Sequence, residues 1–423
     1  MKHFIIIGNS AAGIAAVEAI RKIDKKSKIS VISDEDYPSY CRCLISYYLA
    51  GDIKEDNVRY RPDSFYKDND VRLVLNKKVI RVDPKKNTVS FMDKKEEGYD
   101  HLLIATGSSP KFPDIKGIKK TGVLGFRTMV DAKAIEALVP KAKTACILGG
   151  GLIGLKAAYA LKKKGLGVKV IIKSNQVLSQ VLDFDAAGFV RKRLEEHGIE
   201  ILPGKDAAEI MGEGDVKAVR LDDGKIIDAS LVLVCKGVSP NIDLVNGSGI
   251  KTGIGVVADE NLTTNAANIC AAGDVCETSD PILGRTAVNA LWPVAVEQGR
   301  IAGANMAGGK VAYDGSVGMN SLEFFGLPTV SLGLHKVGDS KDCEEFKVSN
   351  PASSIYKKLI LRANRLVGAV LVGDIRSSGL YLRLIRDKVD VSSFRDKLLE
   401  EDLHYPDIMN FIKDKKDKEN MYV

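Results

Sequence analysis

The sequence predicts an α/β protein in which one strand–turn–helix–strand unit occurs twice. A short apolar run followed by a glycine-containing turn begins at residue 4, and a second run of the same kind begins at residue 145. Hydrophobic residues make up 45% of the chain and charged residues 28%, the balance of a globular protein. The 423 residues exceed the size at which one core stops growing, so we expect two or three domains.

The first unit runs in order through a strand, a turn, a helix and a second strand: 4–7, 8–13, 14–22 and 29–32. Gly8 and Gly13 allow a tight turn, and the start of the following helix presents N–H groups to a pyrophosphate. Ser10 replaces the usual second glycine and is small enough for the same role. Asp34 follows Gly13 by about 20 residues, the expected spacing for a carboxylate that binds ribose hydroxyls. The unit therefore predicts a dinucleotide site.

The second unit repeats this order over residues 145–148, 149–154, 155–163 and 168–172. Gly149, Gly151 and Gly154 complete a full GxGxxG turn. Ile172 stands where a ribose-binding acid would be, and Lys173 follows it. A cation at this position suits a 2′-phosphate and so favours NADPH. A solvated lysine is the alternative, which leaves NADH and NADPH both open.

Several other classes of protein are not expected. No apolar run reaches the ~18 residues that cross a bilayer, and the opening strand is too short for a secretion signal, so we expect a cytoplasmic protein without a membrane span. The net charge of +7 comes with no basic stripe interleaved with aromatic residues, so nucleic acid is not an expected partner. The seven cysteines include no CxxC pair and the five histidines lack metal-ligand spacing, so no metal site is expected.

Three further segments make a family resemblance specific. Residues 99–107 end in Ala105-Thr106-Gly107, residues 231–241 look like the counterpart of this signature in the second unit, and residues 269–275 contain Gly273-Asp274. Together with the two glycine turns, over about residues 1–335, they resemble the FAD- and NAD(P)-dependent pyridine nucleotide–disulfide oxidoreductase family.

The resemblance implies a nested architecture. We expect two nested Rossmann-like dinucleotide-binding domains plus a C-terminal α+β interface domain. The FAD-binding domain would comprise residues 1–112 and 241–315, and the NAD(P)-binding domain residues 113–240. Residues 316–423 would form the C-terminal interface or dimerisation domain.

The resemblance also implies roles for individual residues. Those expected to bind FAD are Gly8, Ser10, Gly13, Asp34, Thr106, Gly107, Arg127, Gly273 and Asp274. Those expected to bind NAD(P)H are Gly149, Gly151, Gly154 and Lys173. Lys156 stands where many members carry a glutamate near the nicotinamide, so the local charge is reversed there.

Cys43 is the candidate catalytic residue. The CxxxxC motif of the glutathione-reductase branch is absent, but Ser39 to Cys43 fits the Ser-x-x-x-Cys frame of NADH oxidases, NADH peroxidases and coenzyme A disulfide reductases. A flavin edge and a helix start would lower the pKa of such a thiol. Oxidases and peroxidases also carry a histidine where this chain has Ala11, which disfavours peroxide reduction. The alternative is a small residue packed in a turn.

A second subgroup offers a different function. The frame Tyr40-x-Arg42-x-Leu44 and the stretches 289–308 and 371–394 resemble rubredoxin and ferredoxin reductases and the flavin portion of assimilatory nitrite reductase. The resemblance implies an FAD-dependent NAD(P)H oxidoreductase that passes electrons between a nicotinamide nucleotide and a protein or metal-centre acceptor. It would act alone or as a subunit of a larger complex, such as a 2-oxoacid:acceptor oxidoreductase.

The expected partners follow from this subgroup. They are an iron–sulfur or rubredoxin-like protein, the subunits of a complex, or a second copy in a homodimer. Two alternative functions stay open: an NAD(P)H-dependent coenzyme A disulfide or persulfide reductase or NADH oxidase that uses Cys43, and a non-catalytic FAD-binding subunit. His404-Tyr405 is a further pair that the resemblance would bring to a neighbouring flavin, with simple packing as its alternative.

Overall fold

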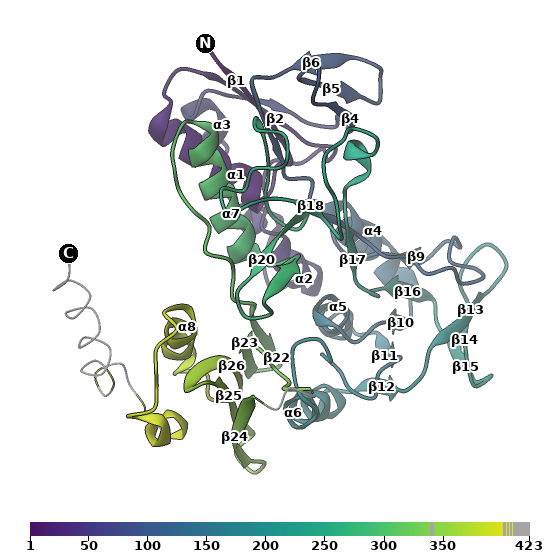
Figure 1. Cartoon of the computed structure of the whole chain (residues 1–423). Coiled ribbons are helices and arrows are strands. Elements are labelled where there is room, and N and C mark those ends of the chain that lie inside the picture. Colours follow the sequence, from purple (N-terminus) through teal and green to yellow (C-terminus); the bar gives the residue numbers. More distant parts are fainter. Residues whose placement is uncertain (339–341, 401–402, 404–405, 407, 409–423) are drawn as a thin grey trace. The chain divides into compact units, whose positions relative to one another are not determined.

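The computed structural model describes residues 1–338, 342–400, 403, 406 and 408; His404 and Tyr405 lie outside the described residues. The chain forms two compact units, and each is assembled from separate stretches of sequence (Figure 1). Unit 1 comprises Met1–Asp114, Leu124–Lys141 and Val234–Ser316. Unit 2 comprises Ile115–Val123, Ala142–Leu233 and the chain from Val317 onward.

Unit 1 is built on a five-stranded parallel sheet. Its strands lie in the order β19 (Ile269–Ala271), β7 (His101–Ile104), β1 (His3–Ile7), β2 (Lys28–Ile32) and β3 (Val71–Val74). Four consecutive residues of β1 are buried, as in a sheet that is covered on both faces. The helix that follows β1 is α1 (Ala11–Ile23).

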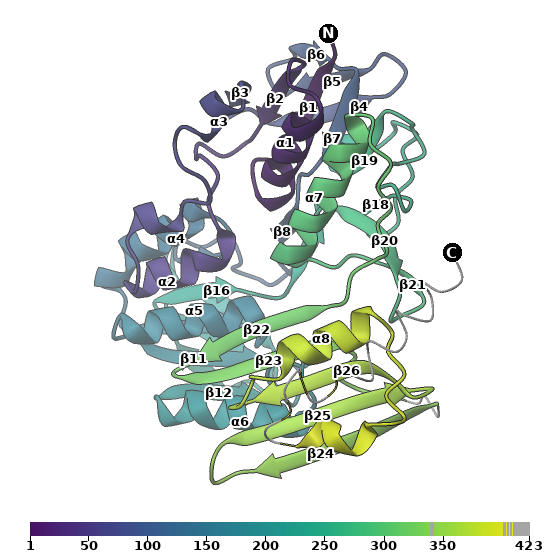
Figure 2. The same cartoon turned by 90° about the vertical axis from the view of Figure 1, so that its left-hand side faces the viewer.

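Helix α1 packs closely against α7 (Trp292–Met306), and the two lie side by side in Figures 1 and 2. Small residues make this approach possible. A Cβ atom added to Gly299 would lie 2.1 Å from the carbonyl oxygen of Ala12, and one added to Gly303 would lie 2.5 Å from that of Ala16. Backbone of α7 therefore touches backbone of α1, which fixes the position of the helix behind the first glycine turn.

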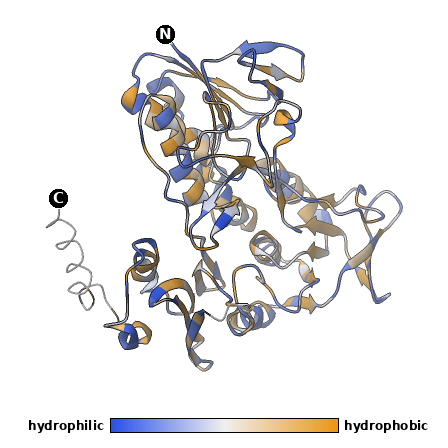
Figure 3. Ribbon diagram, in the orientation of Figure 1, coloured by the Kyte–Doolittle hydropathy of each residue, from blue (hydrophilic) through white to orange (hydrophobic). Residues whose placement is uncertain are grey.

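The smaller elements of unit 1 surround this sheet. Its helices are α2 (Ile45–Ala50), α3 (Phe65–Asp68) and α4 (Met129–Leu138). Its other strands are β4 (Val79–Asp83), β5 (Thr88–Phe91), β6 (Glu96–Gly98), β8 (Ser108–Pro110), β17 (Val238–Pro240), β18 (Val256–Val257), β20 (Cys276–Asp280) and β21 (Arg285–Ala287). The residues of β6 are mainly hydrophilic (Figure 3).

Unit 2 contains a second sheet of the same kind. Its order is β12 (Ile199–Pro203), β11 (Gly167–Ile172), β10 (Thr144–Leu148), β16 (Leu231–Val234) and β9 (Val123–Leu124), and β10, β11 and β12 are parallel. Its helices are α5 (Leu152–Lys163) and α6 (Phe184–Glu196). An antiparallel sheet of β13 (Ala207–Met211), β14 (Ala218–Leu221) and β15 (Ile226–Asp228) completes this part.

The C-terminal part of unit 2 is an antiparallel five-stranded sheet with helix α8 (Ser378–Arg386). Its order is β22 (Met319–Phe324), β23 (Leu327–Gly333), β26 (Arg365–Val372), β25 (Ile355–Arg362) and β24 (Cys343–Asn350). Tyr381, Leu384 and Ile385 form the buried face of α8. The predicted fold class is confirmed: two Rossmann-like parallel sheets are followed by an α+β part.

Candidate functional site

The first glycine turn brings two strand ends into contact. Gly8 has φ +125°, and a Cβ atom there would lie 2.0 Å from the carbonyl oxygen of Ala105, the residue after β7. A Cβ atom on Gly13 would lie 2.0 Å from the carbonyl oxygen of Gly8. Glycine is therefore required at both positions, and the turn brings the start of α1 to the carboxyl ends of β1 and β7.

The start of α1 has the properties of an anion site. Ser10 is the N-cap residue, and within the described residues its side chain makes no capping hydrogen bond. The first turn of α1 contains no acidic residue. The first N–H groups of a helix lack partners inside the helix and attract negative charge. These residues therefore fit a pyrophosphate.

Three acidic residues, Asp34, Glu35 and Asp36, follow β2 and differ in their surroundings. Asp34 is exposed. Glu35 is paired with Arg42 and accepts a hydrogen bond of 2.6 Å from the hydroxyl of Tyr40. The amide of Gly8 donates to the carbonyl of Ile32 at 2.8 Å, so the end of β2 lies beside the glycine turn. Asp34 and Asp36 are thus the exposed acids after β2, and Asp34 is the one closer to the end of the strand.

The segment after β7 is held by the segment after β17. The hydroxyl of Thr106 donates to the Asn241 carbonyl at 2.8 Å, and the Asn241 side-chain amide donates to the Thr106 carbonyl at 2.9 Å. The Asn241 backbone amide also donates to the carbonyl of Gly107 at 2.9 Å. Asn241 is not among the site residues predicted from the sequence, although it lies at the end of the segment 231–241 that resembles the family.

Arg127 and Asp274 form an ion pair. The side chains are 19% and 13% exposed, so the pair is largely shielded from water. The hydroxyl of Ser108 donates to the same carboxylate at 2.9 Å, and Arg127 Nε donates to the Ser108 carbonyl at 3.2 Å. Two residues chosen separately by resemblance are therefore in contact, and Ser108, which was not chosen, joins them.

Gly273 is held by a buried amide. Its φ is +80°, and its N–H donates to Oε1 of Gln298 at 2.8 Å. Gln298 is 1% exposed and comes from α7, the helix that packs on α1. This hydrogen bond places the Gly273-Asp274 turn next to the start of α1.

Cys41 and Cys43 lie on either side of Arg42 in the chain. They flank the start of a single 3₁₀ turn, Arg42–Leu44, and Cys43 is exposed while Cys41 is half-buried. The neighbouring Cys43 thiol lowers the pKa of Cys41 to about 7, and the neighbouring Cys41 thiol raises the pKa of Cys43. Arg127 opposes this rise and Asp274 adds to it. Cys43 was predicted from the Ser-x-x-x-Cys frame that begins at Ser39. The C-x-C spacing could also have drawn attention to Cys41.

The second glycine turn, in unit 2, resembles the first. Gly149 has φ +123°, and its amide donates to the carbonyl of Ile171 at 2.9 Å. Helix α5 starts after Gly151 with no acidic residue in its first turn. A Cβ atom on Gly150 would lie 2.4 Å from the side chain of Ile172, which is 2% exposed.

The residues at the end of β11 differ in exposure: Ile172 is buried, whereas Lys173 and Ser174 are exposed. Because Ile172 packs beneath the turn, it does not face the surface where a ribose would lie. Lys173 and Ser174 are the first exposed residues after this strand. The hydroxyl of Ser174 donates to the carbonyl of Gln176 at 2.7 Å. A cation thus stands at the carboxyl end of the second strand of the unit, where a phosphate on the ribose would be recognised.

Lys156 contacts the C-terminal sheet of the same unit. Its ammonium donates to the carbonyl of Glu323 at 2.7 Å and lies 5.2 Å from the centre of the Phe324 ring. The positive charge of Lys156, which stands where many family members carry a glutamate, is thus held at the end of β22.

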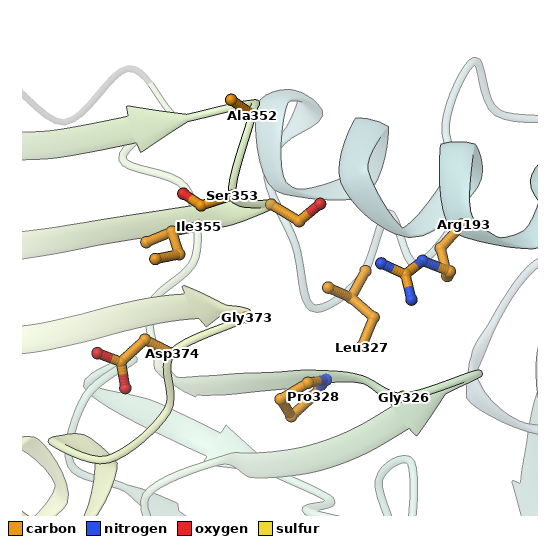
Figure 4. A pocket seen from close by; sticks show the side chains of 10 residues that line it. Arg193, Gly326, Leu327, Pro328, Ala352, Ser353, Ile355, Gly373 and Asp374 are labelled. Carbon is orange, nitrogen blue, oxygen red and sulfur yellow. The ribbon is translucent and has the colours of Figure 1, made fainter.

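A polar pocket of about 450 Å³ lies elsewhere in unit 2 (Figure 4). Arg193 of α6, Leu327 and Pro328 of β23, and Asp374 after β26 are among the residues that line it. Arg193 donates to the carbonyl of Phe325 at 2.9 Å, and Asp374 is paired with Arg376. These charges already have protein partners, and none of the predicted site residues lines this pocket.

Over 1–338, 342–400 and the few described positions beyond, no group of three or more histidine, cysteine, aspartate or glutamate side chains could hold a metal ion. In the same part of the chain, no helix combines the length and the apolar character that crossing a membrane requires.

Comparison with known proteins identifies the family. The model of the family described as pyridine nucleotide-disulphide oxidoreductase matches residues 2–299. The chain belongs to this family. A second model, the rubredoxin NAD+ reductase C-terminal domain, matches residues 319–389 of this oxidoreductase. Members of the family are enzymes that bind FAD and use NAD(P)H, which confirms both predicted cofactors.

Several relatives cover most of the oxidoreductase. A nitrite reductase [NAD(P)H] of Bacillus subtilis is 33% identical over 92% of this chain and 48% of its own length, so the chain spans about half of that relative. An NADH oxidase of Methanocaldococcus jannaschii is 35% identical over 79% of this chain and 74% of its own. The epsilon subunit of an NADH-dependent phenylglyoxylate dehydrogenase of Aromatoleum evansii is 30% identical over 94% of both chains.

A solved structure supports the same relationship. The NAD-dependent persulfide reductase from A. fulgidus superposes with a TM-score of 0.88 and 28% identity, over 95% of this chain and 79% of that one. The oxidoreductase therefore shares its fold with an enzyme of sulfur chemistry, while its C-terminal match is to a reductase of a small redox protein.

The structure divides the predicted site residues of the oxidoreductase into two groups. Those in unit 1 are Gly8, Ser10, Gly13, Asp34, Cys43, Thr106, Gly107, Arg127, Gly273 and Asp274. Those in unit 2 are Gly149, Gly151, Gly154 and Lys173. Each group contains one glycine turn at the start of a helix.

Proposed function

We propose that this protein is an FAD-dependent NAD(P)H oxidoreductase that passes electrons between a nicotinamide nucleotide and a protein or metal-centre acceptor. The observation that carries the proposal is the pair of glycine turns, one in each unit. Each turn ends at a helix whose first turn has no acidic residue. Two separate anion sites of this kind suit two dinucleotides.

In this proposal, unit 1 holds FAD. The start of α1 binds the pyrophosphate, Asp34 binds the adenosine ribose, and the carboxylate of Asp274 accepts hydrogen bonds from the ribityl hydroxyls. Arg127 and Ser108 orient that carboxylate, because both already contact it. FAD, when bound, supplies the chemistry that exchanges a hydride with a nicotinamide and single electrons with an acceptor.

Unit 2 holds the nicotinamide nucleotide in the same proposal. Gly149, Gly151 and Gly154 let its pyrophosphate approach the start of α5, and Lys173 favours a 2′-phosphate. The proposed domains are 1–112 with 241–315 for FAD, 113–240 for NAD(P)H and 316–423 for an interface. The stretch Leu124–Lys141, which carries Arg127, lies in compact unit 1, so it contributes to the FAD site.

The acceptor is proposed to be an iron–sulfur or rubredoxin-like protein, or another subunit of a complex. The match of residues 319–389 to the C-terminal domain of rubredoxin NAD+ reductase supports a redox-protein acceptor. The phenylglyoxylate dehydrogenase subunit, similar over 94% of both chains, supports a role within a 2-oxoacid-oxidising complex. A homodimer and a cytoplasmic location stay predictions.

A second candidate function rests on Cys43. This thiol is exposed and lies near the charges of Arg127 and Asp274. An enzyme that uses it would be a coenzyme A disulfide or persulfide reductase, or an NADH oxidase. The likeness to a persulfide reductase at 28% identity supports this candidate.

The deciding experiment is anaerobic reduction of the purified flavoprotein by NADH and by NADPH, followed by capture of its acceptor from the native host. We expect the flavin absorbance to bleach and the reduced protein to reduce an iron-containing acceptor. A Cys43→Ser variant that retains dye reduction supports electron transfer, and one that loses turnover supports the thiol enzyme. A yellow protein that neither nucleotide bleaches would instead be a non-catalytic FAD-binding subunit. A protein that binds no FAD would contradict all three functions.

A further inference from the structure

We propose that residues 173–183, which connect β11 to α6, act as a positioning segment for the nicotinamide nucleotide. This β11–α6 segment holds the second glycine turn through a backbone hydrogen bond, and the C-terminal sheet of the same unit holds the segment. The inference rests on the proposed function of unit 2 and deepens it. Residues of the C-terminal sheet, which are not part of the glycine turn, set the affinity for NAD(P)H through this segment.

The backbone amide of Leu178 joins the β11–α6 segment to the glycine turn. It donates to the carbonyl of Gly150 at 2.8 Å. The carbonyl of Leu178 accepts hydrogen bonds from the amides of Val181 and Leu182, both at 2.9 Å. Both backbone groups of Leu178 are therefore bonded, and the direction of its amide toward the glycine turn is fixed.

Leu178 adopts a backbone conformation that leucine rarely has. Its φ is +52°, in the left-handed region, and the residue is 1% exposed. A bulky residue is an outlier in that region. Such residues persist only where the surrounding structure over-determines them, and they cluster at functional sites. The strained residue of the β11–α6 segment is the one that bonds to the glycine turn, so its unusual conformation serves the contact with that turn.

The two ends of the β11–α6 segment are also joined to each other. The side-chain amide of Gln176 donates to the carbonyl of Leu182 at 3.0 Å. Near the Lys173 end, the amide of Gly204 donates to the carbonyl of Ser174 at 3.1 Å. Because the segment is closed by its own hydrogen bonds, a displacement of its last residues would reach Leu178.

The C-terminal sheet holds the β11–α6 segment at two places. At the end of the segment, the carboxylate of Asp183 accepts a hydrogen bond of 2.7 Å from the hydroxyl of Tyr356 and is paired with Lys358, both on β25. Next to Leu178, the carbonyl of Ser179 accepts a hydrogen bond of 3.2 Å from the ammonium of Lys336, which follows β23. The sheet thus fixes the residues on both sides of the Leu178 amide.

The consequence is a nucleotide affinity that depends on the sheet. With these contacts in place, the glycine turn is already ordered for a pyrophosphate at the start of α5. Without them, the turn must be ordered when the nucleotide binds, and part of the binding free energy is lost. NADH and NADPH share the pyrophosphate, so both affinities should fall by the same factor. This outcome differs from the role of Lys173, which acts on the 2′-phosphate alone.

The test measures binding without turnover. The purified flavoprotein is titrated with NADP+ and with NAD+, which do not reduce the oxidised flavin, by isothermal titration calorimetry. The double variant Tyr356→Phe/Lys336→Met loses one hydrogen bond at each of the two places. We expect both Kd values to rise about threefold to tenfold, with their ratio unchanged. In dye reduction, KM for NAD(P)H should rise while kcat stays constant. Each single variant is titrated as well, so the test stands if the double variant is unstable.

Hydrogen exchange of the nucleotide-free protein tests the route. The Leu178 amide should exchange about threefold faster or more in the double variant, because its bond to the Gly150 carbonyl opens more often. Lys347→Met is the matched control. It breaks an exposed pair between the same sheet and Asp185 of α6, beyond the β11–α6 segment. This control should leave both Kd values and the exchange of Leu178 unchanged.

The outcomes separate this inference from the proposed function. Wild-type Kd values in the double variant overturn the inference, even where its stability falls, because the sheet then has a structural role only. Raised Kd values without faster exchange of Leu178 also overturn it, since the effect then takes another route. A wild-type protein that binds neither NAD+ nor NADP+ contradicts the proposed function and removes this inference with it.

Discussion

The ammonium of Lys358 lies 3.1 Å from the carboxylate of Asp183, and both side chains are nearly buried. The hydroxyl of Tyr356 donates to the same carboxylate oxygen at 2.7 Å. Asp183 also caps helix α6, accepting from the amide of Ala186 at 2.9 Å. Glu345 lies 2.7 Å from the Lys358 ammonium on its other side. This cluster joins the start of α6 to strand β25 within unit 2.

Removal of one charge from this cluster should destabilise unit 2. Lys358→Met would leave the buried Asp183 carboxylate without its cation, and we expect a loss of roughly 3–5 kcal/mol in unfolding free energy. Urea denaturation measures it. The control is Lys347→Met, which breaks the exposed pair with Asp185 and should cost less than about 1 kcal/mol. Similar losses in both variants would show that the buried pair has no special role.

The close packing of α1 and α7 gives a second prediction. Gly299→Ala would place a methyl group against the Ala12 carbonyl and separate the helices, so we expect a loss of roughly 1–3 kcal/mol in stability. Flavin retention should fall with it, because α1 carries the proposed pyrophosphate site. Gly188→Ala is the control: this exposed helical glycine has no neighbour within 4 Å, so alanine should stabilise the protein by about 0.5–1 kcal/mol. The prediction fails if Gly299→Ala is as stable as the wild type.

Lys173 should favour NADPH over NADH. Lys173→Glu would place a negative charge beside the 2′-phosphate, and we expect kcat/KM for NADPH to fall about tenfold or more, with a smaller change for NADH. Steady-state dye reduction with both nucleotides measures the ratio. Lys225→Glu, in the exposed turn before β15, makes the same charge change elsewhere in unit 2 and should leave the ratio constant. Equal losses for both nucleotides in Lys173→Glu would refute this role.

Arg127 should strengthen FAD binding through Asp274. Arg127→Gln removes a charged hydrogen-bond partner worth about 1.5–3 kcal/mol, so the Kd for FAD should rise about tenfold or more. Fluorescence titration of the apoprotein with FAD measures it. Lys133→Gln, on helix α4 six residues after Arg127, breaks an exposed pair with Glu55, so its Kd should stay close to the wild-type value. Unchanged affinity in Arg127→Gln argues against the assignment.

The reactivity of Cys41 should depend on pH near neutrality. The neighbouring Cys43 thiol lowers the pKa of Cys41 to about 7. The fraction of Cys41 present as thiolate, and with it the alkylation rate, should therefore rise as the pH rises through about 7 and fall at lower pH. In Cys43→Ala the midpoint should move upward toward the ordinary value of about 8.5. The groups that face the pair are the amides of Cys43 and Leu44, with Arg127 and Asp274 beside Cys43. Alkylation at several pH values, trypsin digestion after Lys28 and Arg42, and mass spectrometry of the resulting peptide 29–42 give both midpoints; identical midpoints would rule out this influence of Cys43.

The elements of both glycine units could be predicted from the sequence because their signals are local. Short apolar runs define β1 and β10, and glycines at fixed offsets define the turns. The predicted helices begin three residues late, at 14 and 155 instead of Ala11 and Leu152. Gly13 and Gly154 lie inside these helices despite the low helix propensity of glycine. For Gly13 the reason is tertiary, since only glycine fits against the carbonyl of Gly8.

The sequence by itself determined the fold class, the two dinucleotide turns and the candidate thiol Cys43, because each depends on residues close together along the chain. Only the tertiary structure decided which distant residues meet: Arg127 with Asp274, Asn241 with Thr106, and Lys358 with Asp183. Spacing along a chain does not state which distant residues come into contact, because that depends on how the strands and helices fold back on one another.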